Sequence, residues 1–417
     1  MKPILRRLAW TLAVVAAVAA LLGIALLALL LRLLQPADDE WRAEISFGPW
    51  QRAISLPVLL RFATHPLGVA LLDGRMLRTP FGHWHLQRRH DGLEAQCAPC
   101  TLQWPALGPA PLQWARARAQ LRPLGADRFS GDLLLGEGAH EITLQWKGKL
   151  TARGADVELQ LAPTPASRVV GVFARDLPEA GQVQVTGSVA AVLHGRWPDG
   201  TWRVQPVIEG LAVSGLATER LHDAQLPAAC RTSASDGEPL AGWLPRALVA
   251  AEDARFFEHP GYDLGEMLAA LRHNADAPGD WRGGSTLTQQ LAKLAFTGDD
   301  RSAARKLREL LYAVEMEHTL GKARILQLYL ALAPWGDGVC GAERAAQVYL
   351  GKPAAKLGPV SSAWLVSLLR NPDAQLHSWA DERRIDRDRV REILAGMRPM
   401  TAAQRALAST QVEDWLP

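Results

Sequence analysis

The sequence has little net charge and no marked excess of either sign. Its 46 lysine and arginine residues nearly balance 43 aspartate and glutamate residues, which leaves a formal net charge of +3 at pH 7. Such a balance does not indicate nucleic-acid binding, and it is compatible with phosphate ligands or an anionic membrane surface. With 417 residues the chain exceeds the usual size of one domain, so two or three independently packed units are expected.

Cysteine is also scarce, with four residues in the whole chain. A structural zinc site normally needs two ligand pairs, and no second CxxC or HxxxH accompanies the pair Cys97 and Cys100, so no metal site is predicted. The Cys97-Ala-Pro-Cys100 stretch fits a small disulfide in an oxidising compartment, and Cys230 and Cys340 could form a second one. Structural or unpaired thiols are favoured over a metal site.

The N-terminus carries a long apolar run. Three basic residues within the first seven positions precede 24 residues without a charge, Leu8 to Leu31. This length is sufficient to span a bilayer as a helix, and no clear cleavage site favours a removable signal peptide. Because the basic flank should stay cytoplasmic, residues 1–36 are predicted to be a cytoplasmic stub and a single-pass signal anchor. The remainder is expected in the periplasm of a Gram-negative bacterium.

Residues 37–225 show the two-residue alternation of apolar side chains that is typical of strands. Examples are Ile142, Leu144 and Trp146, and then Val157, Leu159 and Leu161. The turn signals Gly136-Glu137-Gly138 and Pro198-Asp199-Gly200 lie between apolar stretches and predict hairpin connections. We therefore expect a β-rich extracytoplasmic domain. It weakly resembles the β-repeats of AsmA-like periplasmic proteins, without a specific motif, and it contains no candidate catalytic constellation.

A segment rich in proline, serine, alanine and glycine between His222 and Leu240 predicts a domain boundary. Beyond this segment the apolar residues recur at helical spacing, as in Leu307, Leu310, Leu311 and Val314. Residues 226–417 are therefore predicted to form a second, mainly α-helical domain.

Three motifs in this helical region contain candidate functional residues. In the first, Glu252, Phe256 and His259 fall at positions i, i+4 and i+7, so they are predicted to share one face of a helix. Pro260 and Gly261 would then stop that helix. The alternative is an ordinary helix with a solvated acidic face.

The second motif runs from Arg282 to Lys293, with a pair of glycines directly after Arg282. Thr286 and Gln289 have the spacing of a capping box, which predicts a loop that leads into a helix. Free backbone N–H groups at such a helix start, with Lys293 two turns further on, could hold a phosphate. The alternative is an ordinary capped helix.

The third motif is Arg305-Lys306-Leu-Arg308-Glu309. Arg305 and Glu309 are i, i+4 partners, which could simply support an exposed helix. All three motifs in this order and at these spacings are a much rarer coincidence than any one of them.

Together the motifs resemble those of the family 51 peptidoglycan glycosyltransferases, the transglycosylases found alone or fused to penicillin-binding transpeptidase domains. The family's E-D-x-x-F-x-x-H-x-G matches residues 252–261, its G-G-S-T-x-T-Q-Q-L-x-K matches 283–293, and its R-K-x-x-E matches 305–309. Weaker similarity extends the match over residues 240–400. Since the chain contains neither S-x-x-K nor K-T-G, no transpeptidase is expected and the enzyme should be monofunctional.

The resemblance implies a lysozyme-like helical fold for the C-terminal domain, behind the N-terminal transmembrane helix and the β-rich domain. It implies polymerisation of lipid II into β-1,4 glycan strands by inverting transfer, with release of polyprenyl pyrophosphate. The expected partners are lipid II, the growing lipid-linked glycan, the membrane and other cell-wall synthesis proteins. No cofactor is expected to be essential, although a divalent cation such as Mg²⁺ could assist. The expected location is the bacterial inner membrane, with the catalytic domain in the periplasm.

The resemblance also implies roles for individual residues. Glu252 would be the general base that takes the proton of the acceptor hydroxyl. Glu309 matches a second essential glutamate, which could orient cations or assist departure of the pyrophosphate. The developing negative charge of that leaving group would be met by Lys293, Arg305 and Lys306. The other substrate-binding candidates are Asp253, Phe256, His259, Gly284, Ser285, Thr286, Gln289 and Gln290.

Two positions depart from the family pattern. Leu294 and Ala331 stand where the family usually has asparagine, which allows a slow or specialised enzyme. One alternative function is a glycan-cleaving, lysozyme-like enzyme, since a helical fold with an acidic residue can also break glycosidic bonds. The other is a non-catalytic cell-envelope assembly or lipid-binding factor with a degenerate transferase domain.

Overall fold

A computed structural model of the chain describes residues 41–415 apart from short gaps, and before them only residues 18, 21, 32, 35–37 and 39–40. The gaps are residues 48–49, 80–81, 103–110, 126, 174–176, 180, 199–201, 224–229, 231–240, 278, 280–281, 299–302 and 383–384. The predicted membrane anchor at 8–31 thus lies almost wholly outside the described residues. Within the described part, no helix has both the length and the apolar character needed to cross a membrane.

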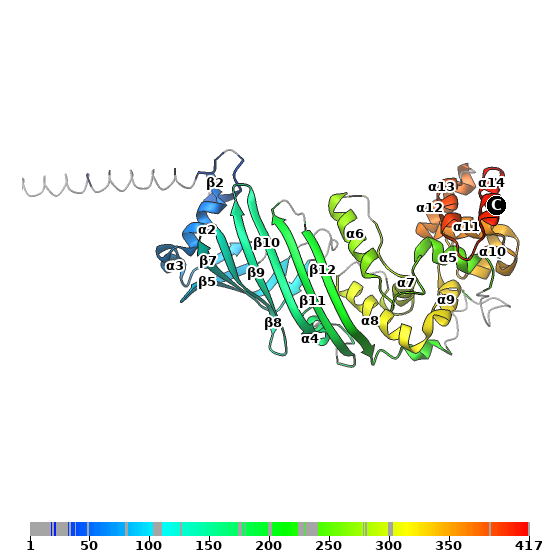
Figure 1. The fold of residues 1–417 in the computed structure, drawn as a ribbon, viewed down its shortest axis with the longest axis horizontal. Coiled ribbons are helices and arrows are strands. Elements are labelled where there is room, and N and C mark those ends of the chain that lie inside the picture. Colours follow the sequence, from blue (N-terminus) through cyan, green and yellow to red (C-terminus); the bar gives the residue numbers. More distant parts are fainter. Residues whose placement is uncertain are drawn as a thin grey trace, which may run out of the picture. The chain divides into compact units, whose positions relative to one another are not determined.

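Antiparallel strands dominate the first half of the chain (Figure 1). The hairpin of β1 (Arg42–Phe47) and β2 (Trp50–Ser55) stands apart from a larger sheet. Among the described residues the larger sheet has ten strands in the order β12-β11-β10-β9-β8-β7-β5-β4-β3, with β6 paired to β5. Their bounds are β3 Met76–Thr79, β4 Gly82–Arg89, β5 Gly92–Leu102, β6 Leu112–Trp114, β7 Ala117–Gly125, β8 Arg128–Glu137, β9 His140–Thr151, β10 Gly154–Pro165, β11 Gln184–Trp197 and β12 Trp202–Ser214.

The sheet agrees with the predicted β-rich region, and sequence neighbours pair through most of it. The predicted turn at 136–138 connects β8 to β9, whose register pairs Glu137 with His140. Residues 199–200 of the second predicted turn lie outside the described residues, although β11 and β12 flank them. The region also contains helices that the alternation did not predict: α2 (Leu56–Thr64), α3 (Pro66–Leu72) and α4 (Ala166–Phe173).

The chain divides into two compact units. The first comprises residues 1–101, 114–162 and 190–205, and the second comprises 102–113, 163–189 and 206–417. The helical unit therefore includes chain segments from the predicted β region, and strands β11 and β12 contribute residues to both units. The domain boundary near residue 225 stays a prediction, because 224–229 and 231–240 are not described.

The second unit is mainly helical, in agreement with the sequence (Figure 1). Its helices are α5 Leu244–Glu252, α6 Leu264–Asp276, α7 Leu287–Ala292, α8 Ala303–Thr319, α9 Gly321–Leu332, α10 Ala342–Leu350, α11 Pro359–Ser367, α12 Pro372–Glu382, α13 Arg387–Gly396 and α14 Ala402–Asp414. Large side chains such as Trp335, Trp364 and Phe256 are fully buried in one hydrophobic core. Leu311 and Val314, from the predicted apolar face of α8, belong to this core.

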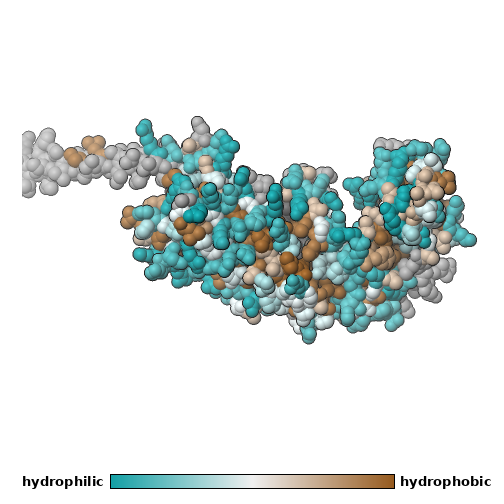
Figure 2. Space-filling model, viewed as in Figure 1, coloured by the Kyte–Doolittle hydropathy of each residue, from teal (hydrophilic) through white to brown (hydrophobic). Residues whose placement is uncertain are grey.

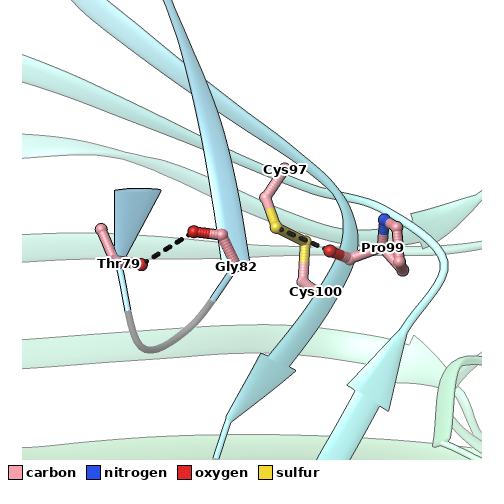
Figure 3. Close-up of a disulfide and its surroundings, with 5 residues drawn as sticks. All are labelled: Thr79, Gly82, Cys97, Pro99 and Cys100. Carbon is pink, nitrogen blue, oxygen red and sulfur yellow. Dashed lines mark hydrogen bonds between the residues drawn. A yellow bond between two sulfur atoms is a disulfide. The ribbon is translucent and has the colours of Figure 1, made fainter. Parts of the chain in front are cut away.

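Two disulfides join the four cysteines in the pairs that the sequence suggested. Cys97 and Cys100 are bonded to each other within β5, next to the carbonyl of Pro99 (Figure 3). Cys230 is bonded to Cys340, which lies 110 positions away along the chain. The second disulfide therefore ties the segment before α5 to the loop after α9.

Candidate active site

The first motif lies at the end of a helix and not inside one. Helix α5 ends at Glu252, and residues 254–261 form consecutive turns and bends. The prediction that Glu252, Phe256 and His259 share a helical face is therefore wrong. Asp253 explains the difference, because its backbone leaves the helical conformation (φ −162°) while its side chain bonds to groups beyond the helix. Glu252 is consequently the last residue of α5 and is partly buried.

Asp253 connects three segments of the site. Its buried carboxylate accepts hydrogen bonds from Nε2 of His259 at 2.9 Å and from the backbone N–H of Leu287 at 2.9 Å. The backbone N–H of Gly261 donates to Nδ1 of His259 at 3.2 Å, so Nδ1 is an acceptor and the ring proton is on Nε2. Asp253 and His259 thus hold α5, the turn after it and the start of α7 together, and both are buried.

Gly261 occupies a position that other residues would not tolerate. Its φ is +90°, and a Cβ atom there would lie 2.8 Å from the carbonyl oxygen of Ala313 in α8. The Gly261 carbonyl accepts a hydrogen bond from Oγ1 of Thr286 at 2.7 Å. The turn is therefore in close contact with α8 and hydrogen-bonded to the N-cap of α7.

The capping box predicted for the second motif is confirmed. Thr286 caps α7, its N–H donates to Oε1 of Gln289 at 3.0 Å, and the N–H of Gln289 donates to Oγ1 of Thr286 at 3.2 Å. The expectation of free N–H groups for a phosphate is wrong for two of them, because Leu287 donates to Asp253 and Gln289 to Thr286. The buried side chains of Thr286 and Gln289 therefore position the helix.

Glu252 receives a hydrogen bond from Nε2 of Gln290 at 3.2 Å. The hydroxyl of Tyr329 donates to Oε1 of the same amide at 2.7 Å, which fixes the amide orientation. Burial raises the pKa of Glu252, with a further increase from Asp253, while the Gln290 hydrogen bond and the charge of Arg389 oppose the rise. Burial, together with the charge of Glu252, raises the pKa of Tyr329, so its hydroxyl stays a neutral donor. Tyr329 and Arg389 were not predicted from the sequence.

The third motif forms a buried ion-pair cluster on α8. Glu309 is paired with Arg305, as its i, i+4 spacing predicts, and with Nζ of Lys306 at 2.8 Å. The exposed-helix alternative is wrong for this pair, because only 1% of the Glu309 side chain is exposed. Lys306 also donates to Oγ of Ser285 at 2.7 Å and keeps 53% of its side chain exposed. This lysine therefore links the second and third motifs at the surface.

Phe256 lies in the core, and the amino group of Lys322 lies against its ring. Lys322 places its Nζ 4.5 Å from the Phe256 ring centroid, donates to the His259 carbonyl at 2.7 Å and pairs with Glu317 at 2.8 Å. Glu317 also accepts from Oγ1 of Thr288 at 2.6 Å. Phe256 is fully buried, so it supports the turn from beneath. Lys322 and Glu317 were not predicted, since their bonds to His259 and Thr288 span 63 and 29 positions of the chain.

Helix α8 is also held by residues that precede residue 225. Glu179, between α4 and β11, pairs with Arg308 through Oε2 and Nε at 2.9 Å, and accepts from the hydroxyl of Tyr312 at 3.1 Å. Burial alone would raise the pKa of Glu179, but its hydrogen bonds and the Arg308 charge hold that pKa below the ordinary value. Further along α8, Glu315 accepts from the N–H of Leu216 at 3.0 Å. No local pattern in the sequence could reveal these contacts.

The remaining predicted positions differ in exposure. Lys293 follows α7 as its C-cap and is half-buried, and Gly284 lies in the loop before α7. Leu294 is exposed, whereas Ala331 is buried in α9 with its carbonyl oxygen 3.1 Å from where a Cβ of Gly341 would lie. Among the described residues, no group of three or more His, Cys, Asp and Glu side chains is arranged to hold a metal ion.

The region that contains the three motifs is similar to a known protein family. The sequence model of the family described as transglycosylase matches residues 225–398, which contain all three motifs. The similarity to the transglycosylase family thus covers the part of the chain that contains Glu252 and Glu309.

Several proteins named biosynthetic peptidoglycan transglycosylase are similar to about a third of this chain. The Nitrosomonas eutropha protein is 44% identical over 137 residues, which are 33% of this chain and 56% of the relative. The Azoarcus protein is 41% identical over 152 residues, 36% of this chain and 66% of the relative. The Rhodospirillum centenum protein is 46% identical over 140 residues, 34% of this chain and 58% of the relative. The chain thus spans between half and two thirds of the length of these relatives.

Proposed function

We propose that this protein is a monofunctional peptidoglycan glycosyltransferase that polymerises lipid II into β-1,4 glycan strands, with inversion and release of polyprenyl pyrophosphate. The observation that carries the proposal is the presence of two glutamates with different burial and partners in the region that matches the transglycosylase family. Glu252 is partly buried and receives a hydrogen bond from a neutral amide, whereas Glu309 is fully buried between two cations. These environments suit a base and a charge-organising group respectively.

Glu252 acts in this mechanism as the general base. The acceptor hydroxyl is a weak nucleophile, so a carboxylate must take its proton as it attacks the anomeric carbon. Burial raises the pKa of Glu252, which makes the carboxylate a stronger base than an exposed glutamate. Gln290, held by Tyr329, keeps one carboxylate oxygen engaged and thereby orients the other.

Lys306 and its neighbours stabilise the leaving pyrophosphate. A lysine ammonium has three donors, and Lys306 uses two of them on Glu309 and Ser285. The third donor of this half-exposed side chain is left for a pyrophosphate oxygen. Arg305 and Lys293 add positive charge near the developing anion. Glu309 orients the two cations of its own motif.

The remaining substrate-binding candidates divide into supporting and contacting groups. Asp253, Phe256, His259, Thr286 and Gln289 are buried and support the site, while Gly284 and Ser285 border it. No cofactor is essential in the proposed reaction. A divalent cation such as Mg²⁺ could be bound with the pyrophosphate oxygens as its principal ligands.

The proposal includes a membrane location. Both substrates carry polyprenyl tails, and a tether raises the effective concentration of the domain at the bilayer surface. The apolar run at 8–31 would provide that tether as a single-pass anchor of the inner membrane, with the catalytic domain in the periplasm. In this organisation residues 37–225 and 226–417 form the β-rich and catalytic domains. Lipid II, the growing glycan and other cell-wall synthesis proteins are the proposed partners.

The test is polymerisation of labelled lipid II by the full-length protein in detergent, with the product treated with a muramidase. We expect wild type to yield digestible polymer and Glu252→Gln to yield at most traces of it. Glu258→Gln is the matched control, because Glu258 is an exposed glutamate of the same motif. Release of fragments from preformed glycan would favour the lytic alternative. Folded wild-type protein that makes no polymer would favour a non-catalytic assembly factor.

A further inference from the structure

Helix α3 is apolar on two opposite sides, but only one side is covered. Its sequence, PLGVALL, contains no polar side chain. Val69 and Leu72 pack against Leu86 of β4 and Leu93 of β5 in a small core. Leu67 and Leu71, four positions apart on the outer side, are 72% and 61% exposed. Because an apolar helix is normally buried all round, the outer side requires a partner.

Helix α2 extends this uncovered surface. A Cβ atom at Gly68 would lie 1.8 Å from the carbonyl oxygen of Phe62 and 3.3 Å from its ring, so the two helices are in backbone contact there. Phe62 itself is 41% exposed beside α3. Phe62, Leu67 and Leu71 together form what we call the α2–α3 patch. Figure 2 shows brown apolar surface among polar residues over these two helices.

The β1–β2 hairpin places the start of α2 beside Trp41. The hairpin pairs Arg42 with Ser55, and the N–H of Leu56 at the start of α2 donates to the carbonyl of Trp41 at 3.0 Å. Helix α2 therefore starts beside a residue that lies only ten positions after Leu31. Ten residues reach at most about 35 Å when fully extended. If residues 8–31 span a bilayer, α2 must lie within that distance of its surface.

The charges near the patch suit phospholipid headgroups. Arg75 and Arg78 follow α3 and are exposed, and within the described part of the chain the structure gives neither of them an ion pair. Arginine beside an apolar surface favours contact with anionic lipid. Arg61 of α2 is different, because it is already paired with Asp127.

We propose that the α2–α3 patch inserts into the surface of a phospholipid bilayer, with Arg75 and Arg78 on the headgroups. The first unit is then attached to the membrane at two points, the anchor and the patch. This inference goes beyond the proposed glycosyltransferase activity and rests only on the proposed anchor.

Depth-dependent fluorescence quenching tests the proposal without lipid II. The four native cysteines are in disulfides, so Leu71→Cys adds the one thiol available for an environment-sensitive fluorophore. The labelled full-length protein is reconstituted in vesicles of phosphatidylethanolamine and phosphatidylglycerol with lipids spin-labelled near the headgroup. Leu124→Cys is the matched control, since Leu124 is an exposed leucine of β7 outside the patch.

We expect the label at position 71 to lose most of its fluorescence to the spin-labelled lipid and the label at 124 to lose almost none. Introducing Leu67→Glu should abolish the quenching at 71 without unfolding the protein, because Leu67 is exposed. Equal quenching at both positions would overturn the proposal. Protection of position 71 from aqueous iodide without lipid quenching would indicate a second copy as the partner and would also overturn it. Failure of the protein to float with the vesicles would also overturn the proposal. Loss of polymerisation alone would leave the proposal intact.

Discussion

Glu179, which lies outside all three motifs, is predicted to stabilise the helix that carries Glu309. Its carboxylate pairs with Arg308 and accepts from Tyr312. Only 15% of the Glu179 side chain and 19% of the Arg308 side chain are exposed. Glu179→Ala would therefore leave a largely buried guanidinium without its counter-ion, next in sequence to Glu309 and its ion pairs.

Removal of one partner from a buried ion pair costs about 3–5 kcal/mol. Since water still reaches both side chains, we expect a smaller cost of about 2–4 kcal/mol for Glu179→Ala. For a unit of this size such a loss lowers the unfolding midpoint by about 4–16 °C. Arg308→Met should be similarly destabilising, whereas the double variant Glu179→Leu/Arg308→Met should recover much of the loss because no unpaired charge remains.

The effect should depend on pH in a defined direction. The pKa of Glu179 lies below its ordinary value in the folded protein, as its hydrogen bonds and the Arg308 charge outweigh burial. The stabilisation is therefore complete above the pKa of the unfolded chain and is lost as the pH falls through the folded pKa. The difference between wild type and Glu179→Ala should accordingly shrink in acid.

The assay is thermal unfolding of the full-length proteins, followed by circular dichroism, together with polymerisation rates. Glu413→Ala is the control, because Glu413 is an exposed glutamate whose pair with Arg391 should contribute little. We expect Glu179→Ala to unfold at a clearly lower temperature than this control and to polymerise more slowly. An unfolding midpoint equal to that of the control, or additive effects in the double variant, would refute the reasoning.

Four further predictions concern the site and its surroundings. Because burial raises the pKa of Glu252 and a base must be ionised, the polymerisation rate should rise with pH through that raised pKa. The same raised pKa means that the folded protein favours the neutral form of the Glu252 carboxyl. This stabilisation is lost as the pH rises through the folded pKa. Thermal unfolding at pH 8 should therefore find Glu252→Gln, whose side chain is always neutral, at least as stable as wild type. Gly261→Ala should cost at least about 1–3 kcal/mol in the unfolding free energy, because its φ is +90° and Cβ would meet the Ala313 carbonyl; an unchanged midpoint would contradict this. Cys340→Ser should lower stability by about 2–5 kcal/mol in the same thermal assay, because it removes a long-range cross-link to Cys230.

Local patterns in the sequence predicted local structure well. The Thr286–Gln289 capping box and the Arg305–Glu309 pair are both present, since each depends only on the spacing of two residues along one helix. The alternation in the first half of the chain likewise predicted the sheet. Motif spacing also identified the domain that contains Glu252.

The errors arose where contacts between distant segments decide the backbone. The helix expected to continue past Glu252 ends there, because Asp253 bonds to His259 and to the N–H of Leu287, 34 residues further on. Glu179 could not be predicted, because its partner Arg308 lies 129 positions away. The apolar sequence of α3 also fits a buried strand, so spacing alone could not identify it as a helix.

The most direct test of the proposed mechanism is the initial rate of lipid II polymerisation by Glu252→Gln, measured beside Glu258→Gln and wild type. Since a general base contributes about 10²- to 10⁴-fold, we predict a loss of that order for Glu252→Gln and a near wild-type rate for the control. A folded Glu252→Gln protein that polymerises lipid II as fast as wild type would contradict the assignment of Glu252 as the base.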